Sequence, residues 1–91
     1  KGKLDARAIV EGYERGQRDF AQEELNALNL QRARLPGINF YQSKLTGSNL
    51  QDADLSHADL GRANLSQAIL KNTNLSQAYL SYADLDRADL R

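Results

Sequence analysis

Large apolar residues recur at every fifth position over most of the chain. From position 20 to position 90, each fifth residue is a leucine or a phenylalanine. A small residue lies two positions before most of them, at Ala33, Ser43, Ser48, Ala53, Ala58, Ala63, Ala68, Thr73, Ala78, Ala83 and Ala88. Mostly polar residues fill the other positions. The sequence therefore consists largely of tandem repeats of five residues.

Neither a regular helix nor a flat strand has this period. On an α-helix of about 3.6 residues per turn, five steps rotate by about 140° and would scatter the leucines around the cylinder. On a strand, five steps move the side chain to the opposite face. A short extended segment followed by a corner keeps every fifth residue inward, with Ala58 and Leu60 on one face and Asp59 on the other.

The two residues after each leucine are predicted to turn the corner. They are turn-tolerant types, as in Ser56-His57 and Gly61-Arg62. Pro36-Gly37 suits a type II turn, with proline first and glycine second. Successive coils can then stack at about 4.8 Å through backbone hydrogen bonds, and the leucines fill the interior. A period of five alone leaves the number of corners per coil open.

The units ADLSH, ADLGR, ANLSQ, AYLSY and ADLDR are variants of a tandem A(D/N)LXX repeat. This pattern resembles the pentapeptide repeat family, and the lead-in YERGQRDF resembles its cyanobacterial members. The resemblance covers roughly residues 18–91. It implies an all-β solenoid, a right-handed quadrilateral β-helix with four repeats per coil and nearly four coils here. Phe20 and Phe40 would then stack.

A coil of twenty residues aligns the outward side chains into four ladders. The predicted ladders are Asp19, Asn39, Asp59 and Tyr79; Glu24, Lys44, Asn64 and Asp84; Asn29, Asn49, Ile69 and Asp89; and Arg34, Asp54 and Asn74. Neutral side chains stand among the charged ones on every ladder, so no face is uniformly charged.

Residues 1–17 lack the period of five and are predicted to form an N-terminal capping helix before the single β-helix domain at 18–91. Leu4, Ala8, Ile9 and Tyr13 lie on one helical face. Asp5 is the expected N-cap, and Gly16 is placed to end the helix. The helix would cover the open first coil.

The first repeats depart from the pattern. Arg18 and Glu23 occupy the position of the small residue, and Leu28 is large for a tight corner. Because an unpaired buried charge is costly, the chain is predicted to bend outward or form a loop in the stretch 20–35.

Composition excludes several classes of function. The 12 basic and 12 acidic residues cancel, which argues against a nucleic-acid binder driven by charge. With no cysteine, disulfides and thiolate metal sites are excluded. No apolar run is long enough to span a membrane and no signal peptide is evident, so a cytoplasmic location is expected. Lys1 at the start, and the undiminished repeat at Arg91, predict a domain of a longer protein.

Catalytic chemistry is not predicted. The aspartates recur with the repeat instead of converging on a cleft, which is typical of solvated faces. His57 is the only histidine, and it lies at a predicted corner. Phosphate-binding glycine motifs are absent. We therefore expect no enzyme activity, no cofactor, no metal and no small-molecule substrate.

Three outward tyrosines are the candidate protein-binding residues. Tyr79 and Tyr82 lie on one side and its following corner, Tyr41 lies elsewhere in the repeats, and Ile69 lies on the opposite face. Together with the family resemblance, they favour a non-catalytic scaffold or protein-interaction module. Its partner would be another protein or another domain of a parent chain, for example a cyanobacterial serine/threonine kinase.

Two alternatives involve other partners. Some members of the family imitate DNA and inhibit DNA gyrase, but the neutral charge and short length of this chain disfavour that function. The uncovered edge after Leu90 suggests a homodimer formed through the C-terminal coil.

Overall fold

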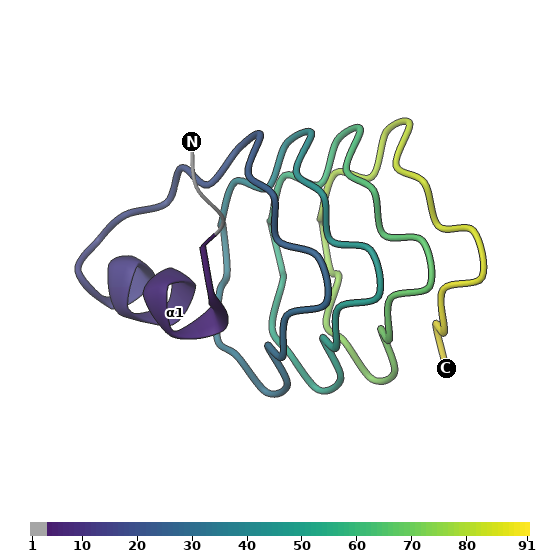
Figure 1. The fold of residues 1–91 in the computed structure, drawn as a ribbon, viewed down its shortest axis with the longest axis horizontal. Helices are drawn as coiled ribbons and strands as arrows, with labels where there is room; N and C mark the ends of the chain where they lie inside the picture. The colour runs from purple at the N-terminus through teal and green to yellow at the C-terminus, as the bar shows by residue number, and fades with distance from the viewer. Residues whose placement is uncertain (1–3) are drawn as a thin grey trace.

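The computed structural model describes residues 4–91 as one helix, α1 (Ala6–Glu14), followed by stacked coils of extended chain (Figure 1). Within this range no strand exceeds a single bridged residue, because each side of a coil bridges once and then turns. No helix in this range has the length and apolar character needed to cross a membrane.

Parallel bridges join residues twenty positions apart. They run through Asp19, Asn39, Asp59 and Tyr79; Glu24, Lys44, Asn64 and Asp84; Asn29, Asn49, Ile69 and Asp89; and Arg34, Asp54 and Asn74. The four predicted ladders are therefore confirmed, and each coil has four sides of five residues. The count of nearly four coils stays a prediction, because the bridges establish the period but not where the first coil begins.

Each corner is a two-residue turn whose second residue is left-handed. At Ser56-His57, His57 has a φ of 61°, and the Ala58 N–H donates to the Leu55 carbonyl at 3.1 Å. At the predicted turn Pro36-Gly37, Gly37 has a φ of 74°, and the Ile38 N–H donates to the Leu35 carbonyl at 3.2 Å. This is the arrangement of a type II turn, as predicted.

Where an aspartate or asparagine precedes the inward leucine or phenylalanine, its side chain stabilises the next corner. Asp59 Oδ1 accepts the N–H of Gly61, two residues on, at 2.9 Å. The same contact is made by Asp19, Asn29, Asn39, Asn49, Asp54, Asn64, Asn74, Asp84 and Asp89. These side chains therefore have a structural role, because each accepts a hydrogen bond from a corner amide that has no partner in the ladder.

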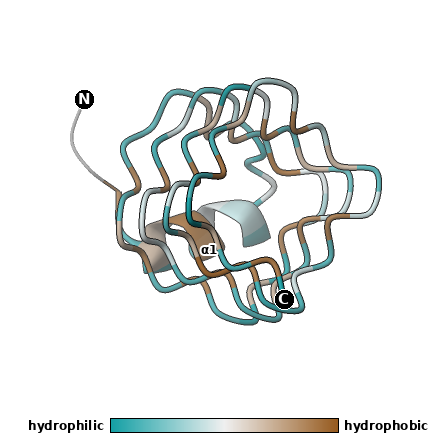
Figure 2. Cartoon of the chain, turned by 90° about the vertical axis from the view of Figure 1, so that its right-hand side faces the viewer, coloured by the Kyte–Doolittle hydropathy of each residue, from teal (hydrophilic) through white to brown (hydrophobic). Residues whose placement is uncertain are grey.

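Apolar residues recur around the coils (Figure 2), and their buried side chains form one core cluster. Leucines from Leu25 to Leu70 are buried, and Phe20 and Phe40 lie next to each other in one column as predicted, with ring centroids 6.4 Å apart and the ring planes tilted by 55° instead of stacked. Burial declines toward the C-terminal end, where Leu80 and Leu85 are half-buried and Leu90 is 55% exposed.

Helix α1 lies across the first coil (Figure 1). Asp5 Oδ1 accepts the Ala8 N–H at 2.8 Å, which confirms the predicted N-cap. At the other end Gly16 is left-handed, with a φ of 100°, and its N–H and that of Gln17 bond back to the helix carbonyls in a Schellman motif. Ile9 is fully buried in the core cluster. Residues 1–3 of the predicted capping segment lie outside the described residues.

The prediction that residues 20–35 bend outward is wrong, since their bridges follow the same register as the rest. Serines of the following coil make room for the large residues. Ser48 Oγ donates to the Leu25 carbonyl at 3.0 Å and accepts the Leu28 N–H at 3.1 Å. Ser43 Oγ likewise donates to the Phe20 carbonyl and accepts the Glu23 N–H. Each serine hydroxyl therefore bridges the carbonyl and the N–H of a corner that the large side chain of Leu28 or Glu23 widens.

Candidate protein-binding site

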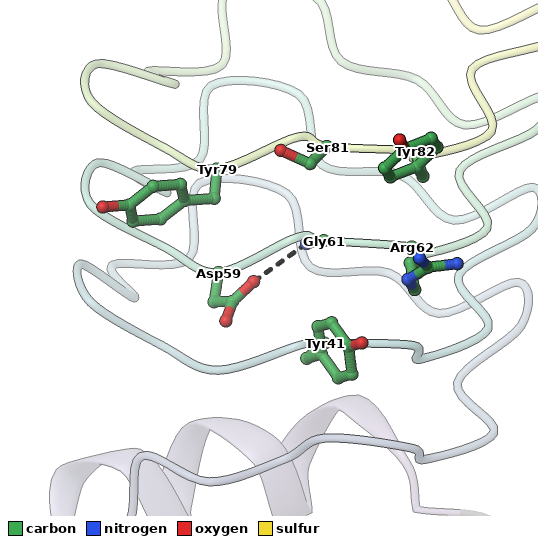
Figure 3. A pocket seen from close by; sticks show the side chains of 7 residues that line it. All are labelled: Tyr41, Asp59, Gly61, Arg62, Tyr79, Ser81 and Tyr82. Carbon is green, nitrogen blue, oxygen red and sulfur yellow. Dashed lines mark hydrogen bonds between the residues drawn. The ribbon is translucent and has the colours of Figure 1, made fainter.

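Three of the four tyrosines surround one hollow on the side of the solenoid (Figure 3). The hollow has a volume of about 380 Å³, and its lining consists of Tyr41, Asp59, Gly61, Arg62, Tyr79, Ser81 and Tyr82. These residues come from the same side and corner of three successive coils. We call this feature the tyrosine hollow.

Gly61 forms the floor of the tyrosine hollow. It is buried in a column of first turn residues, between Tyr41 of the preceding coil and Ser81 of the following one. A Cβ at this position would lie 3.1 Å from Tyr41 Cδ1 and 3.1 Å from Asp59 Oδ1. The absence of a side chain therefore lets the Tyr41 ring lie against the backbone and leaves the centre of the site open.

Tyr79 occupies a ladder position that is aspartate or asparagine in most repeats. In those repeats the side-chain oxygen accepts the N–H of the first turn residue, as Asp59 does for Gly61. A tyrosine has no oxygen near enough to its own backbone to do the same for Ser81. Tyr79 is 69% exposed, so it neither stabilises its corner in this way nor fills the core.

Tyr82 is a bulky residue in the left-handed region, with a φ of 59°. This conformation is unfavourable for residues with a large side chain and is favoured by glycine and asparagine. The Tyr82 side chain is 82% exposed, and one face of its ring lies under the Arg62 guanidinium, 4.8 Å from the centroid. Tyr79 and Tyr82 are thus both locally unfavourable choices that place aromatic surface in water.

The charges around the hollow balance. Asp59 lies on one side of Gly61 and Arg62 on the other, and Asp59 Oδ1 is already engaged with the Gly61 N–H (Figure 3). The site therefore presents aromatic rings, a serine hydroxyl and one charge of each sign.

The perturbed carboxyl groups of the chain lie outside this site. Hydrogen bonds from the Ser56 side chain and backbone lower the pKa of Asp54. Arg91 lowers the pKa of Asp89 to about 2 through its side-chain and backbone hydrogen bonds. Both shifts arise from donors within the same turn, as the repeat requires, and neither marks a catalytic pair.

The structure places the predicted residues as follows. Tyr79 and Tyr82 lie on one surface, and Tyr41 joins them although the sequence pattern alone did not group it with them. Ile69 lies on the ladder of the opposite face and is 36% exposed. His57 is an exposed turn residue. Across residues 4–91, histidine and acidic side chains do not gather into a group of three that would hold a metal.

Sequence reasoning missed Gly61, Arg62, Asp59 and Ser81 as parts of the site. Their signal is the step of twenty, which puts positions 41, 61 and 81 in one column and positions 62 and 82 in the next. If the step of twenty is applied to the corner positions as well as to the ladders, it predicts that Tyr41 lies near Tyr79 and Tyr82.

Three similar solved structures come from cyanobacteria. HetL of Nostoc sp. strain PCC 7120, a pentapeptide repeat protein involved in heterocyst differentiation regulation, is 34% identical with a TM-score of 0.95; the match covers 97% of this chain and 37% of HetL. Rfr23 of Cyanothece 51142 is 29% identical with a TM-score of 0.73, over 80% of this chain and 54% of Rfr23. The protein alr5209 of Nostoc PCC 7120 is 36% identical with a TM-score of 0.53, over 93% of this chain and 78% of that protein.

This chain therefore spans little more than a third of the length of HetL and about half of that of Rfr23. A search of curated proteins found no match. The model of the pentapeptide repeats matches residues 24–62 and 58–91 with 8 copies. Members of that family form right-handed quadrilateral β-helices and are structural repeat proteins. The ladders, the corners and these matches agree that the chain belongs to the pentapeptide repeat family.

Proposed function

We propose that the chain is a non-catalytic scaffold that binds a protein partner through the tyrosine hollow. The observation that carries this proposal is the convergence of Tyr41, Tyr79 and Tyr82 around Gly61. Tyrosine is a favoured anchor in protein interfaces because its ring buries a large area at a small entropic cost. Two of the three rings are mostly exposed, at a local cost to the repeat.

Two further considerations support a binding role. A second hollow within residues 4–91 has no aromatic lining, since Gln22, Glu23, Glu24, Gln42 and Lys44 surround it. HetL, whose fold the chain shares, is involved in heterocyst differentiation regulation, a role that is compatible with binding a partner protein. The partner is either a separate protein or another domain of a parent chain, for example a serine/threonine kinase of the kind that carries a pentapeptide domain.

A pull-down from cyanobacterial lysate tests the proposal. The bait chain is compared with a Tyr79→Ala/Tyr82→Ala variant, and Ile69→Ala on the opposite face is the matched control. We expect a protein identified by mass spectrometry to be captured by the bait chain and the control, and lost with the double variant. Equal capture by all three would overturn the proposed face, and capture by none would overturn the binding role.

The gyrase-inhibitor alternative receives less support. A DNA mimic needs a surface of one sign, whereas neutral side chains interrupt every ladder here and two of the ladders also carry a basic residue, Arg34 or Lys44. A supercoiling assay decides between the two, since a scaffold leaves the rate of DNA gyrase unchanged at a large excess of the chain.

A further inference from the structure

We propose that the tyrosine hollow takes a proline-rich segment in the polyproline II conformation, lying along the solenoid axis. This inference rests on the proposed function, because it concerns the same surface, and it names the chemistry of the partner. It is drawn from three features of the site: its neutral rim, its spacing along the axis and its phenol groups.

The neutral rim selects against a charged ligand. Asp59 and Arg62 contribute opposite charges, Asp59 Oδ1 accepts the Gly61 N–H, and the Arg62 guanidinium lies over the Tyr82 ring. A carboxylate or an ammonium group entering the hollow would meet one attractive and one repulsive charge. Proline is uncharged, and its ring packs well on aromatic faces in grooves that bind proline-rich segments.

The spacing of the coils that carry the rings matches a polyproline helix. Tyr41 and Tyr82 belong to coils two steps apart, and at about 4.8 Å per coil this is about 9.6 Å along the axis. A polyproline II helix has three residues per turn and a rise of about 3.1 Å, so residues three apart lie on the same side at about 9.3 Å. A β-strand would place the two residues on opposite faces.

The third feature is the supply of hydrogen-bond donors. A polyproline II segment has no internal hydrogen bonds, so its carbonyl groups require donors from the partner or from water. The exposed Tyr79 and Tyr82 carry phenol hydroxyls, and Ser81 between them adds another (Figure 3). Because Gly61 has no side chain, the Tyr41 ring packs against the Gly61 backbone, and a proline ring would lie in the hollow beside that ring.

The test is an NMR titration of the labelled chain with a blocked oligoproline peptide. A blocked Gly-Ser peptide of the same length is the control ligand. We expect saturable shifts at the amides of Gly61 and Ser81 with oligoproline alone. Tyr79→Ala should weaken binding about tenfold, as loss of an interface anchor does. Ile69→Ala should leave it unchanged, and added salt should change it by less than about twofold because the contacts are uncharged.

Gly61→Ala provides a second variant. It keeps every tyrosine but places a Cβ 3.1 Å from Tyr41, in the floor of the hollow, so binding should fall while far-UV circular dichroism confirms folding. The inference is overturned by absent shifts, by equal shifts with the Gly-Ser peptide, or by binding that salt abolishes. If lysate capture depends on Tyr79 and Tyr82 but oligoproline does not bind, the proposed function stands and this inference fails.

Discussion

Ser48 reconciles a large corner residue with the regular ladder. It is buried, and its hydroxyl supplies partners for both the Leu25 carbonyl and the Leu28 N–H. Ser48→Ala would leave both backbone groups without that partner. Because a buried polar group left unsatisfied costs about 1–3 kcal/mol, we expect a loss of that order in the free energy of unfolding. Urea denaturation followed by circular dichroism measures it.

Ser66→Ala is the control for this variant. The Ser66 hydroxyl is half-buried and meets only the Thr46 hydroxyl, at 3.4 Å, so its removal should change stability by less than about 0.5 kcal/mol. Equal stability of the Ser48→Ala variant and the parent chain would show that the open corner does not depend on the hydroxyl.

Asp54 should titrate below its usual pKa of about 3.9 because Ser56 donates to it twice, through Oγ at 2.7 Å and through the backbone at 3.0 Å. Its contribution to stability is therefore fully present above that usual value and is lost as the pH falls through the lowered pKa. In a carboxyl-carbon NMR titration, Ser56→Ala should raise the pKa of Asp54, whereas Ser66→Ala should not. An unchanged pKa in Ser56→Ala would assign the shift to the backbone donor alone.

At the scale of elements, α1 depends on its N-cap. The helix has only 9 residues, too few to be stable alone, so capping and docking on the first coil hold it. Asp5→Ala removes the acceptor of the Ala8 N–H and should lower the free energy of unfolding by about 1 kcal/mol. Asp5→Asn, which retains an acceptor oxygen, should lose much less. The midpoint of thermal unfolding distinguishes the two variants. Equal midpoints for Asp5→Ala and the parent chain would show that the cap contributes nothing to stability.

At the scale of the whole molecule, the coils should differ in protection from hydrogen exchange. The Leu60 N–H donates forward to the Tyr79 carbonyl at 2.8 Å, and the last such bond runs from Leu70 to Asp89. Leu80 lies above Leu60 in the same column, with no further coil beyond it in residues 4–91. In dilute solution we expect the backbone amide hydrogen of Leu60 to exchange with solvent orders of magnitude more slowly than that of Leu80. Similar rates would mean that the stack opens as one unit.

We propose that two copies of residues 1–91 pair through their C-terminal coils. Leu90 is 55% exposed, and within residues 4–91 no leucine N–H after that of Leu70 donates to a following coil. We expect light scattering to show a rise from one chain to two as concentration increases, with Leu90→Asp remaining at one. Protection of Leu80 should rise over the same concentration range. A mass of one chain at every concentration would exclude this contact.

What the sequence by itself determined is the repeating part of the structure. The period of five defined the inward leucines and the corners, and the family resemblance supplied the four sides and hence the ladders, because these depend on interactions that recur in every repeat. Asp5 and Gly16 delimited α1 because capping is local. Only the tertiary structure decided how Ser48 supports the Leu28 corner and how Tyr41 reaches Tyr79 and Tyr82. Both depend on side chains twenty or more residues apart, which meet only when the coils stack and a residue such as Gly61 leaves the space.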